Sequence, residues 1–129
     1  IQPEKRMLSS MTPTIVASNG KPYLVIGSPG GRTIINTVFQ TVLNVVAYHM
    51  PVDKAIEAVK IHHQWLPDQI VYEKDLFSID TKRNLEQMGH HLRPVSSLGS
   101  LMGIVIDREN RILIGASDSS SADGKAVGY

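Results

Sequence analysis

Cysteine is absent from this chain of 129 residues, so disulfides, thiolate metal sites and a cysteine nucleophile are excluded. The same absence leaves the redox compartment undetermined. An excess of one charge is also missing, because 13 basic residues face 12 acidic ones and the net charge is only +1. Since the basic residues are scattered along the chain, the composition argues against nucleic-acid binding as the main function.

Long hydrophobic runs are lacking as well. The most apolar stretch, residues 34–47, is shorter than the roughly 20 residues of a membrane span, and it is interrupted by Asn36, Thr37, Gln40, Thr41 and Asn44. We therefore expect no membrane-spanning segment. The chain begins with Ile1 and shows no signal or transit segment, so we expect either the removal of an upstream segment or a piece of a longer product.

The hydrophobic content of 42% is enough for the core of one small domain, which we expect to span residues 1–129. Two apolar runs, residues 14–18 and 23–26, flank Asn19-Gly20, a pair that suits a type I′ turn and predicts a β-hairpin. Glycine and proline at residues 27–31 predict a turn. Apolar residues at spacings of three and four then predict a helix ending before Pro51, with a buried stripe made by Ile35, Val38, Val42, Val45 and Val46 and widened by Ile34, Phe39 and Leu43.

The rest of the chain mixes short helices and strands. Pro51 opens a second helix, whose buried side carries Val52, Ala55, Ile56 and Val59. Residues 62–67 are expected to be extended, residues 70–73 to form a strand, and residues 78–89 to form a helix that Ser78 caps and Gly89 ends. A second hairpin is predicted from residues 101–106 and 111–115, followed by a loop over residues 117–128. Segregated helices and strands favour an α+β fold over regular βαβ alternation.

The sequence Gly27-Ser28-Pro29-Gly30-Gly31, between a strand and a helix, is the most informative local arrangement. Glycines let the backbone approach a ligand, and the first N–H groups of a helix have no acceptor within it. The loop can therefore bind a phosphate, a carboxylate or a transient oxyanion. A turn that contains glycine for steric reasons alone is the alternative. The loop is not a Walker A sequence, since Gly31-Arg32-Thr33 replaces the required Gly-Lys-Ser/Thr.

Other polar groups have simpler interpretations. The pair Ser9-Ser10 can donate to a carboxylate or act as ordinary turn and cap residues. Neighbouring residues of an extended segment point to opposite faces, so His62-His63 favours structural hydrogen bonds over a metal site, and the same holds for His90-His91. Asp118 is followed by serines but lacks a Gly-x-Ser-x-Gly elbow, so we expect a solvated loop there rather than a Ser-His-Asp set. We expect no metal and no cofactor.

Four motifs follow one another along nearly the whole chain. They are Leu8-Ser9-Ser10-Met11-Thr12-Pro13-Thr14-Ile15-Val16, the glycine loop just described, His62-His63-Gln64-Trp65-Leu66-Pro67-Asp68, and Gly115-Ala116-Ser117-Asp118 leading to Gly128-Tyr129. Together they closely resemble the gamma-glutamyltranspeptidase (gamma-glutamyltransferase) family. The resemblance implies an N-terminal-nucleophile (Ntn) hydrolase fold, an αββα sandwich of two sheets between helical layers, of which this chain is the C-terminal part of the small subunit.

The resemblance also implies a chemistry. In that family a precursor cuts itself into a large and a small subunit, and the new N-terminal threonine attacks the γ-glutamyl amide of glutathione or a related compound. The γ-glutamyl group then passes to water, an amino acid or a dipeptide. Carried over by motif, Ser9 and Ser10 would hydrogen-bond the substrate α-carboxylate, and the Gly30 and Gly31 amides would form the oxyanion hole. The family's habit in bacteria is a periplasmic or secreted location.

Some family features have no counterpart here. Ile1 is not Thr, Ser or Cys, so we expect the nucleophile to lie outside this chain, and the chain alone to be inactive. The family's arginine after Ser-Asp-Pro is replaced in Asp118-Ser119-Ser120-Ser121. An incomplete sandwich would expose a sheet edge and apolar faces, so we expect self-association or pairing with the large subunit and the rest of the small subunit. The alternative is a non-enzymatic homologue that acts as an anion-binding or subunit-interaction module.

Overall fold

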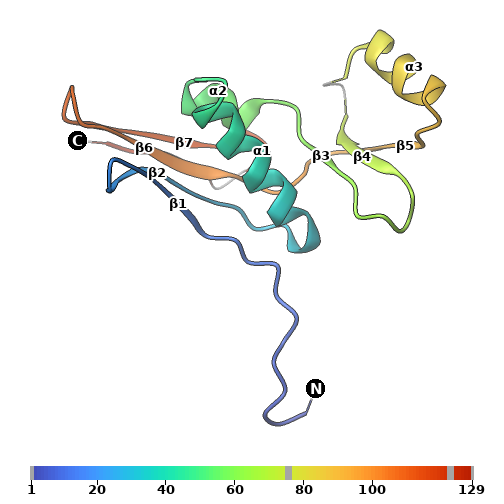
Figure 1. Ribbon diagram of the computed structural model, residues 1–129, viewed down its shortest axis with the longest axis horizontal. Helices are drawn as coiled ribbons and strands as arrows, with labels where there is room; N and C mark the ends of the chain where they lie inside the picture. The colour runs from blue at the N-terminus through green and yellow to red at the C-terminus, as the bar shows by residue number, and fades with distance from the viewer. Residues whose placement is uncertain (1, 75–76, 122–123, 129) are drawn as a thin grey trace.

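A four-stranded sheet is built from two antiparallel hairpins (Figure 1). The computed structural model describes residues 2–74, 77–121 and 124–128, so Tyr129 lies outside the described residues. The strands are β1 (Thr14–Ser18), β2 (Lys21–Gly27), β6 (Met102–Asp107) and β7 (Ile112–Ser117), in the order β1-β2-β6-β7. Asn19 and Gly20 have positive φ angles of 52° and 73°, as a type I′ turn requires. Both predicted hairpins are confirmed.

Two helices cover one face of this sheet. A short 3₁₀ turn, η1 (Gly31–Thr33), leads directly into α1 (Ile34–Val46), and α2 (Val52–Glu57) follows after Pro51. Apolar side chains from β2, both helices and the residue before β6 pack into one core, which consists of Leu24, Ile26, Ile34, Val38, Val45, Val52, Ala55, Ile56 and Leu101. Within the described ranges, no helix combines the length and apolar character that crossing a membrane requires.

The buried stripe of α1 differs from the predicted one. Thr37 and Thr41 are fully buried, and burial is tolerated because their hydroxyls donate to the carbonyls of Thr33 and Thr37 one turn earlier; Thr37 Oγ1 also lies 3.5 Å from the Leu98 carbonyl oxygen. The stripe is therefore rotated, and four apolar residues of the helix remain on the outside, namely Ile35, Phe39, Leu43 and Val46. We call these four residues the outer stripe.

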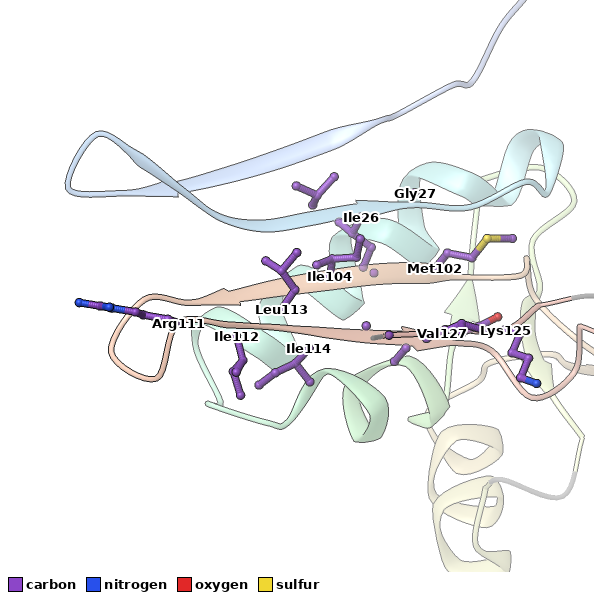
Figure 2. Close-up of a pocket in the computed structure, with 17 residues that line it drawn as sticks. Ile26, Gly27, Met102, Ile104, Arg111, Ile112, Leu113, Ile114, Lys125 and Val127 are labelled. Carbon is purple, nitrogen blue, oxygen red and sulfur yellow. The ribbon is translucent and has the colours of Figure 1, made fainter.

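The face of the sheet opposite the helices is largely open, although residues 125–128 line part of it beside β7. Leu24 and Ile26 point to the helices, so Val25 between them and its cross-strand partner Ile104 point the other way. Figure 2 shows the same alternation on β7, where Leu113 lies on one side of the strand and Ile112 and Ile114 on the other. This open face carries the exposed apolar residues Ile15, Val25, Met102, Ile104 and Leu113, and the last four line a groove of about 960 Å³.

A three-stranded sheet lies beside the first (Figure 1). It consists of β3 (Ile61–His62), β4 (Ile70–Glu73) and β5 (Leu92–Val95). The strands β4 and β5 pair in parallel, and α3 (Ile79–Gln87) connects them along the chain. The caps of α3 are confirmed, since Thr81 N donates to Ser78 Oγ and Gly89 has a φ of 89°. The whole arrangement of helices and sheets confirms the α+β class.

Three details of this region differ from the expectations. Strand β5 lies at residues 92–95, for which no element was predicted; it contains Pro94, which cannot donate a ladder hydrogen bond, and it lies at the edge of its sheet, where proline is tolerated. Val59 is not on α2, since Ala58 has a ψ of 151° and ends the helix. The extended segment predicted for residues 62–67 is wrong beyond His62, because the chain bends there and Trp65 has a φ of 71°.

Candidate active site

The glycine loop connects the end of β2 to η1 and α1. Gly30 and Gly31 have φ angles of 143° and 58°, and both residues are exposed. The carbonyl of Gly30 accepts from Thr33 N at 3.3 Å and from Thr33 Oγ1 at 3.0 Å. No hydrogen bond among the described residues uses the N–H of Gly30 or Gly31. The loop therefore offers two adjacent N–H groups at the surface, at the positive end of α1.

A second segment, residues 98–100, packs directly against this loop, and we call it the backing segment. Ser100 N donates to Ser28 Oγ at 2.9 Å. A Cβ added to Gly30 would lie 3.1 Å from the Cα of Gly99, and a Cβ added to Gly99 would lie 2.5 Å from Ser28 Oγ and 3.1 Å from the Pro29 carbonyl oxygen. Gly99, whose φ is 81°, is therefore required for this close approach. Nothing in the residues around Gly99 predicted this contact with a segment about 70 positions earlier in the chain.

The serine pair lies in the irregular segment that precedes β1. Ser9 Oγ accepts from Met11 N at 3.2 Å, and Thr12 Oγ1 donates to the Ser10 carbonyl at 2.9 Å. Because Thr14 pairs with Ile26, the start of β1 lies beside the end of β2, and the serine segment and the glycine loop leave the sheet at the same end (Figure 1). No hydrogen bond among the described residues joins them.

A buried ionic group lies behind the backing segment, and we call Lys60, Glu73 and Asp118 the buried triad. Lys60 Nζ lies 3.2 Å from Glu73 Oε2 and 3.4 Å from Asp118 Oδ2, and it donates to the Ile56 carbonyl at 2.9 Å. Each of the three side chains is at most 7% exposed. The prediction of a solvated loop at Asp118 is therefore wrong. The signal in the sequence was a charged residue at each of two apolar runs, namely Lys60 beside Val59 and Ile61 and Glu73 after residues 70–72.

The surroundings of Asp118 also shift the pKa of its carboxyl group. Burial raises the pKa of Asp118, but hydrogen bonds from Ser120 Oγ and N and the charge of Lys60 outweigh that effect, so the pKa lies below its ordinary value. Ser120 donates at 2.6 Å through Oγ and at 2.9 Å through N. The carboxylate thus stays ionised inside the protein at neutral pH.

This shift predicts a pH dependence of stability. Because the pKa of Asp118 is lower in the folded state, its stabilising contribution is complete above the unfolded value of about 3.9 and is lost as the pH falls through the folded value. Asp118→Asn is expected to flatten the fall of the unfolding free energy below about pH 5, as measured by urea unfolding at several pH values. Asp53→Asn, at an exposed carboxylate, is the control. Equal slopes in the wild type and Asp118→Asn would contradict this assignment.

The histidine pairs make structural contacts. His62 is buried, with Nε2 2.9 Å from Gln64 Oε1, and His63 Nε2 lies 3.0 Å from Asp68 Oδ1, so the expected structural hydrogen bonds are confirmed for this pair. His90-His91 bonds through its backbone, to Leu85 O and from Ile70 N. Among residues 2–74, 77–121 and 124–128, no group of three or more His, Asp or Glu side chains could hold a metal ion.

Comparison with known proteins identifies the family. The family model for gamma-glutamyltranspeptidase matches residues 1–129. The chain belongs to the gamma-glutamyltranspeptidase family. It is 46% identical over 129 residues to the glutathione hydrolase proenzyme of Escherichia coli K12, and 42% identical over 130 residues to that of Bacillus subtilis 168. These matches cover 100% and 99% of this chain but 22% of each relative, so the chain spans about a fifth of their length.

Solved gamma-glutamyltranspeptidases have the same fold. An acivicin-inhibited gamma-glutamyltranspeptidase superposes with a TM-score of 0.89 at 40% identity, and covers 95% of this chain and 66% of that one. The enzyme of Pseudomonas nitroreducens in complex with L-DON gives a TM-score of 0.87 at 38% identity, and covers 100% of this chain and 66% of that one. The Ntn-hydrolase fold expected for this gamma-glutamyltranspeptidase chain is thereby confirmed.

Proposed function

We propose that this chain supplies the oxyanion hole and the α-carboxylate-binding groups of an active site that transfers γ-glutamyl groups. The donor is glutathione or a related γ-glutamyl compound, and the acceptor is water, an amino acid or a dipeptide. The observation that carries the proposal is the exposed pair of N–H groups at Gly30 and Gly31, which have no acceptor among the described residues. Attack on an amide carbonyl produces a negative oxygen, and two fixed N–H donors stabilise that charge without rearrangement.

Ser9 and Ser10 complete the proposed donor site. Their segment leaves the sheet at the same end as the glycine loop, and we propose that in the complete enzyme it lies where the two hydroxyls meet the α-carboxylate of a glutamate bound at the loop. A hydroxyl donates a charge-assisted hydrogen bond to a carboxylate, which is stronger than a neutral one. The curated relatives that match are named glutathione hydrolase proenzymes, which supports a γ-glutamyl substrate.

The remaining catalytic groups come from outside this chain in the proposed enzyme. Because the chain spans about a fifth of its relatives' length, we propose that the nucleophilic threonine belongs to the rest of the small subunit and that the chain alone is inactive. The open face and the outer stripe are exposed apolar surfaces, which the rest of the small subunit and the large subunit would cover. Without them, such surfaces favour self-association.

The proposal predicts the effect of removing both hydroxyls. In the full-length protein that contains this chain, Ser9→Ala combined with Ser10→Ala is expected to raise the KM for a γ-glutamyl donor about 100-fold, because each lost hydrogen bond to a carboxylate costs about 1.5 kcal/mol or more. The kcat should change less. Steady-state hydrolysis of a chromogenic γ-glutamyl anilide measures both constants.

A second serine pair provides the matched control. Ser96 and Ser97 are exposed, directly precede the backing segment and make no side-chain hydrogen bond among the described residues, so replacing both with Ala should leave the KM unchanged. An unchanged KM in the Ser9 and Ser10 variant would remove these residues from the donor site. Absence of any γ-glutamyl turnover in the unaltered full-length protein would instead favour the non-enzymatic alternative, an anion-binding or subunit-interaction module.

A further inference from the structure

The orientation of Glu73 is determined by contacts on both of its carboxylate oxygens. Oε2 lies 3.2 Å from Lys60 Nζ and accepts from Lys60 N at 3.3 Å, while Oε1 accepts from Leu98 N at 2.9 Å. Asp118 holds the same ammonium group from another side at 3.4 Å. A buried carboxylate with both oxygens in use cannot rotate without leaving a donor unpaired, which is costly in the interior. The buried triad therefore holds the N–H of Leu98 in one place.

Leu98 begins the backing segment, which carries this constraint to the glycine loop. Its side chain is 3% exposed, and the next residue, Gly99, has no room for even one added carbon against the loop. Ser100 N then bonds Ser28 Oγ at 2.9 Å. The carboxylate of Glu73 is thus connected to the Gly30 backbone in three steps. It accepts a hydrogen bond from Leu98 N, one peptide unit joins Leu98 to Gly99, and the backbone of Gly99 packs tightly against Gly30. Close-packed groups transmit small displacements rather than absorb them.

We propose that Glu73, held by Lys60 and Asp118, is a positioning residue that sets the orientation of the Gly30 and Gly31 N–H groups through the backing segment. This inference rests on the proposed function, because it assigns those N–H groups to the oxyanion. An oxyanion forms only along the reaction path, so a misplaced hole lowers kcat and leaves the binding of the donor nearly unchanged. Glu73 itself need not touch the substrate.

Two substitutions in the full-length protein test the connection at its two ends. Glu73→Gln weakens the hold of the buried triad on Leu98, and Ser28→Ala removes the acceptor of Ser100 N with a smaller risk to folding. A displacement of about 1 Å at a reacting group costs about 100-fold in rate, so we expect kcat to fall about 10- to 100-fold in Glu73→Gln and less in Ser28→Ala. The KM for the donor should stay within about twofold in both variants.

Glu57→Gln is the matched control. Glu57 accepts from Ser119 N and Ser119 Oγ, both at 2.7 Å, so it holds the residue next to Asp118 and makes no hydrogen bond to the backing segment. A carboxylate is lost in both variants. If Glu57→Gln lowers kcat as much as Glu73→Gln, or if KM and kcat change together with the melting temperature, the role of Glu73 is only structural and the proposal is overturned.

Hydrogen exchange tests the same connection without any substrate. In Glu73→Gln the amides of Leu98, Ser100 and Thr33 are expected to exchange faster than in Glu57→Gln, since Thr33 N reports on the Gly30 carbonyl. Faster exchange at Leu98 with unchanged exchange at Thr33 and unchanged kcat would overturn the proposal. Failure of the proposed function would give a different result. The unaltered full-length protein would then show no γ-glutamyl turnover, whatever the rates of amide hydrogen exchange in the variants.

Discussion

Gly30→Ala is expected to lower the kcat for γ-glutamyl transfer by about 100-fold or more, with a much smaller change in KM, in the full-length protein. The backbone φ angle of Gly30 is 143°, a value that residues with a side chain rarely adopt. The added Cβ would also lie 3.0 Å from Thr33 Oγ1 and 3.1 Å from the Cα of Gly99. The backbone of Gly99 cannot rotate away as a flexible side chain could, so the glycine loop must move.

The movement matters because, in the proposed oxyanion hole, the N–H groups of the loop would stabilise the negative oxygen only from a fixed position. Removing one donor from an oxyanion hole costs about 100- to 1,000-fold in kcat. The same donors contribute little to binding of the ground state, whose carbonyl is not yet charged. Steady-state kinetics with a γ-glutamyl anilide separates the two constants.

Gly20→Ala is the control for Gly30→Ala. Gly20 also has a positive φ, 73°, but an added Cβ would meet nothing within 4 Å. It lies in the turn of the β1–β2 hairpin, at the opposite end of β2 from the glycine loop (Figure 1). This variant should lose a little stability and keep its kcat. A Gly30→Ala enzyme with normal kcat would show that these N–H groups do not bind the oxyanion.

Lys60→Met should destabilise the folded protein by about 3–5 kcal/mol. Lys60 is the cation of the buried triad, and its removal leaves Glu73 and Asp118 as carboxylates with side chains at most 7% exposed and no counter-ion in that group. Methionine has a similar length and shape, so the loss comes from charge rather than from a cavity. Urea unfolding of the full-length protein, followed by circular dichroism, measures the change in unfolding free energy.

Lys54→Met is the matched control for Lys60→Met. Lys54 lies 3.7 Å from Asp53, and the two side chains are 71% and 58% exposed. An exposed pair of this kind is worth at most about 1 kcal/mol, because water screens it. If Lys60→Met and Lys54→Met lose the same small amount of unfolding free energy, the buried triad does not hold together the three chain segments that carry Lys60, Glu73 and Asp118.

Local chemistry made several elements of this chain predictable. The turn at Asn19-Gly20 and the ends of α3 at Ser78 and Gly89 depend on neighbouring residues, and the structure has them where they were predicted. The glycine loop was recognisable for the same reason, since a run of glycine and proline between a strand and a helix limits what the backbone can do. The motifs also pointed to the family that the comparisons show.

Contacts between distant segments were not predictable in this way. The outer stripe of α1 is exposed because Thr37 and Thr41 bond their own helix and occupy the buried side, which apolar spacing alone does not reveal. Strand β5 contains a proline and depends on β4 for its pairing. Asp118 looked like part of a solvated loop because its partner Lys60 is remote in the sequence.

The amino-acid sequence by itself determined the family, the two hairpins and the loop that presents two N–H groups, because each depends on residue types that are close together in the chain. Only the tertiary structure decided what lies behind that loop. It brought Gly99 against Gly30 and joined Lys60, Glu73 and Asp118 in the interior. The physical reason is that a close approach or a buried ion pair depends on how separate segments pack, and packing is a property of the folded chain as a whole.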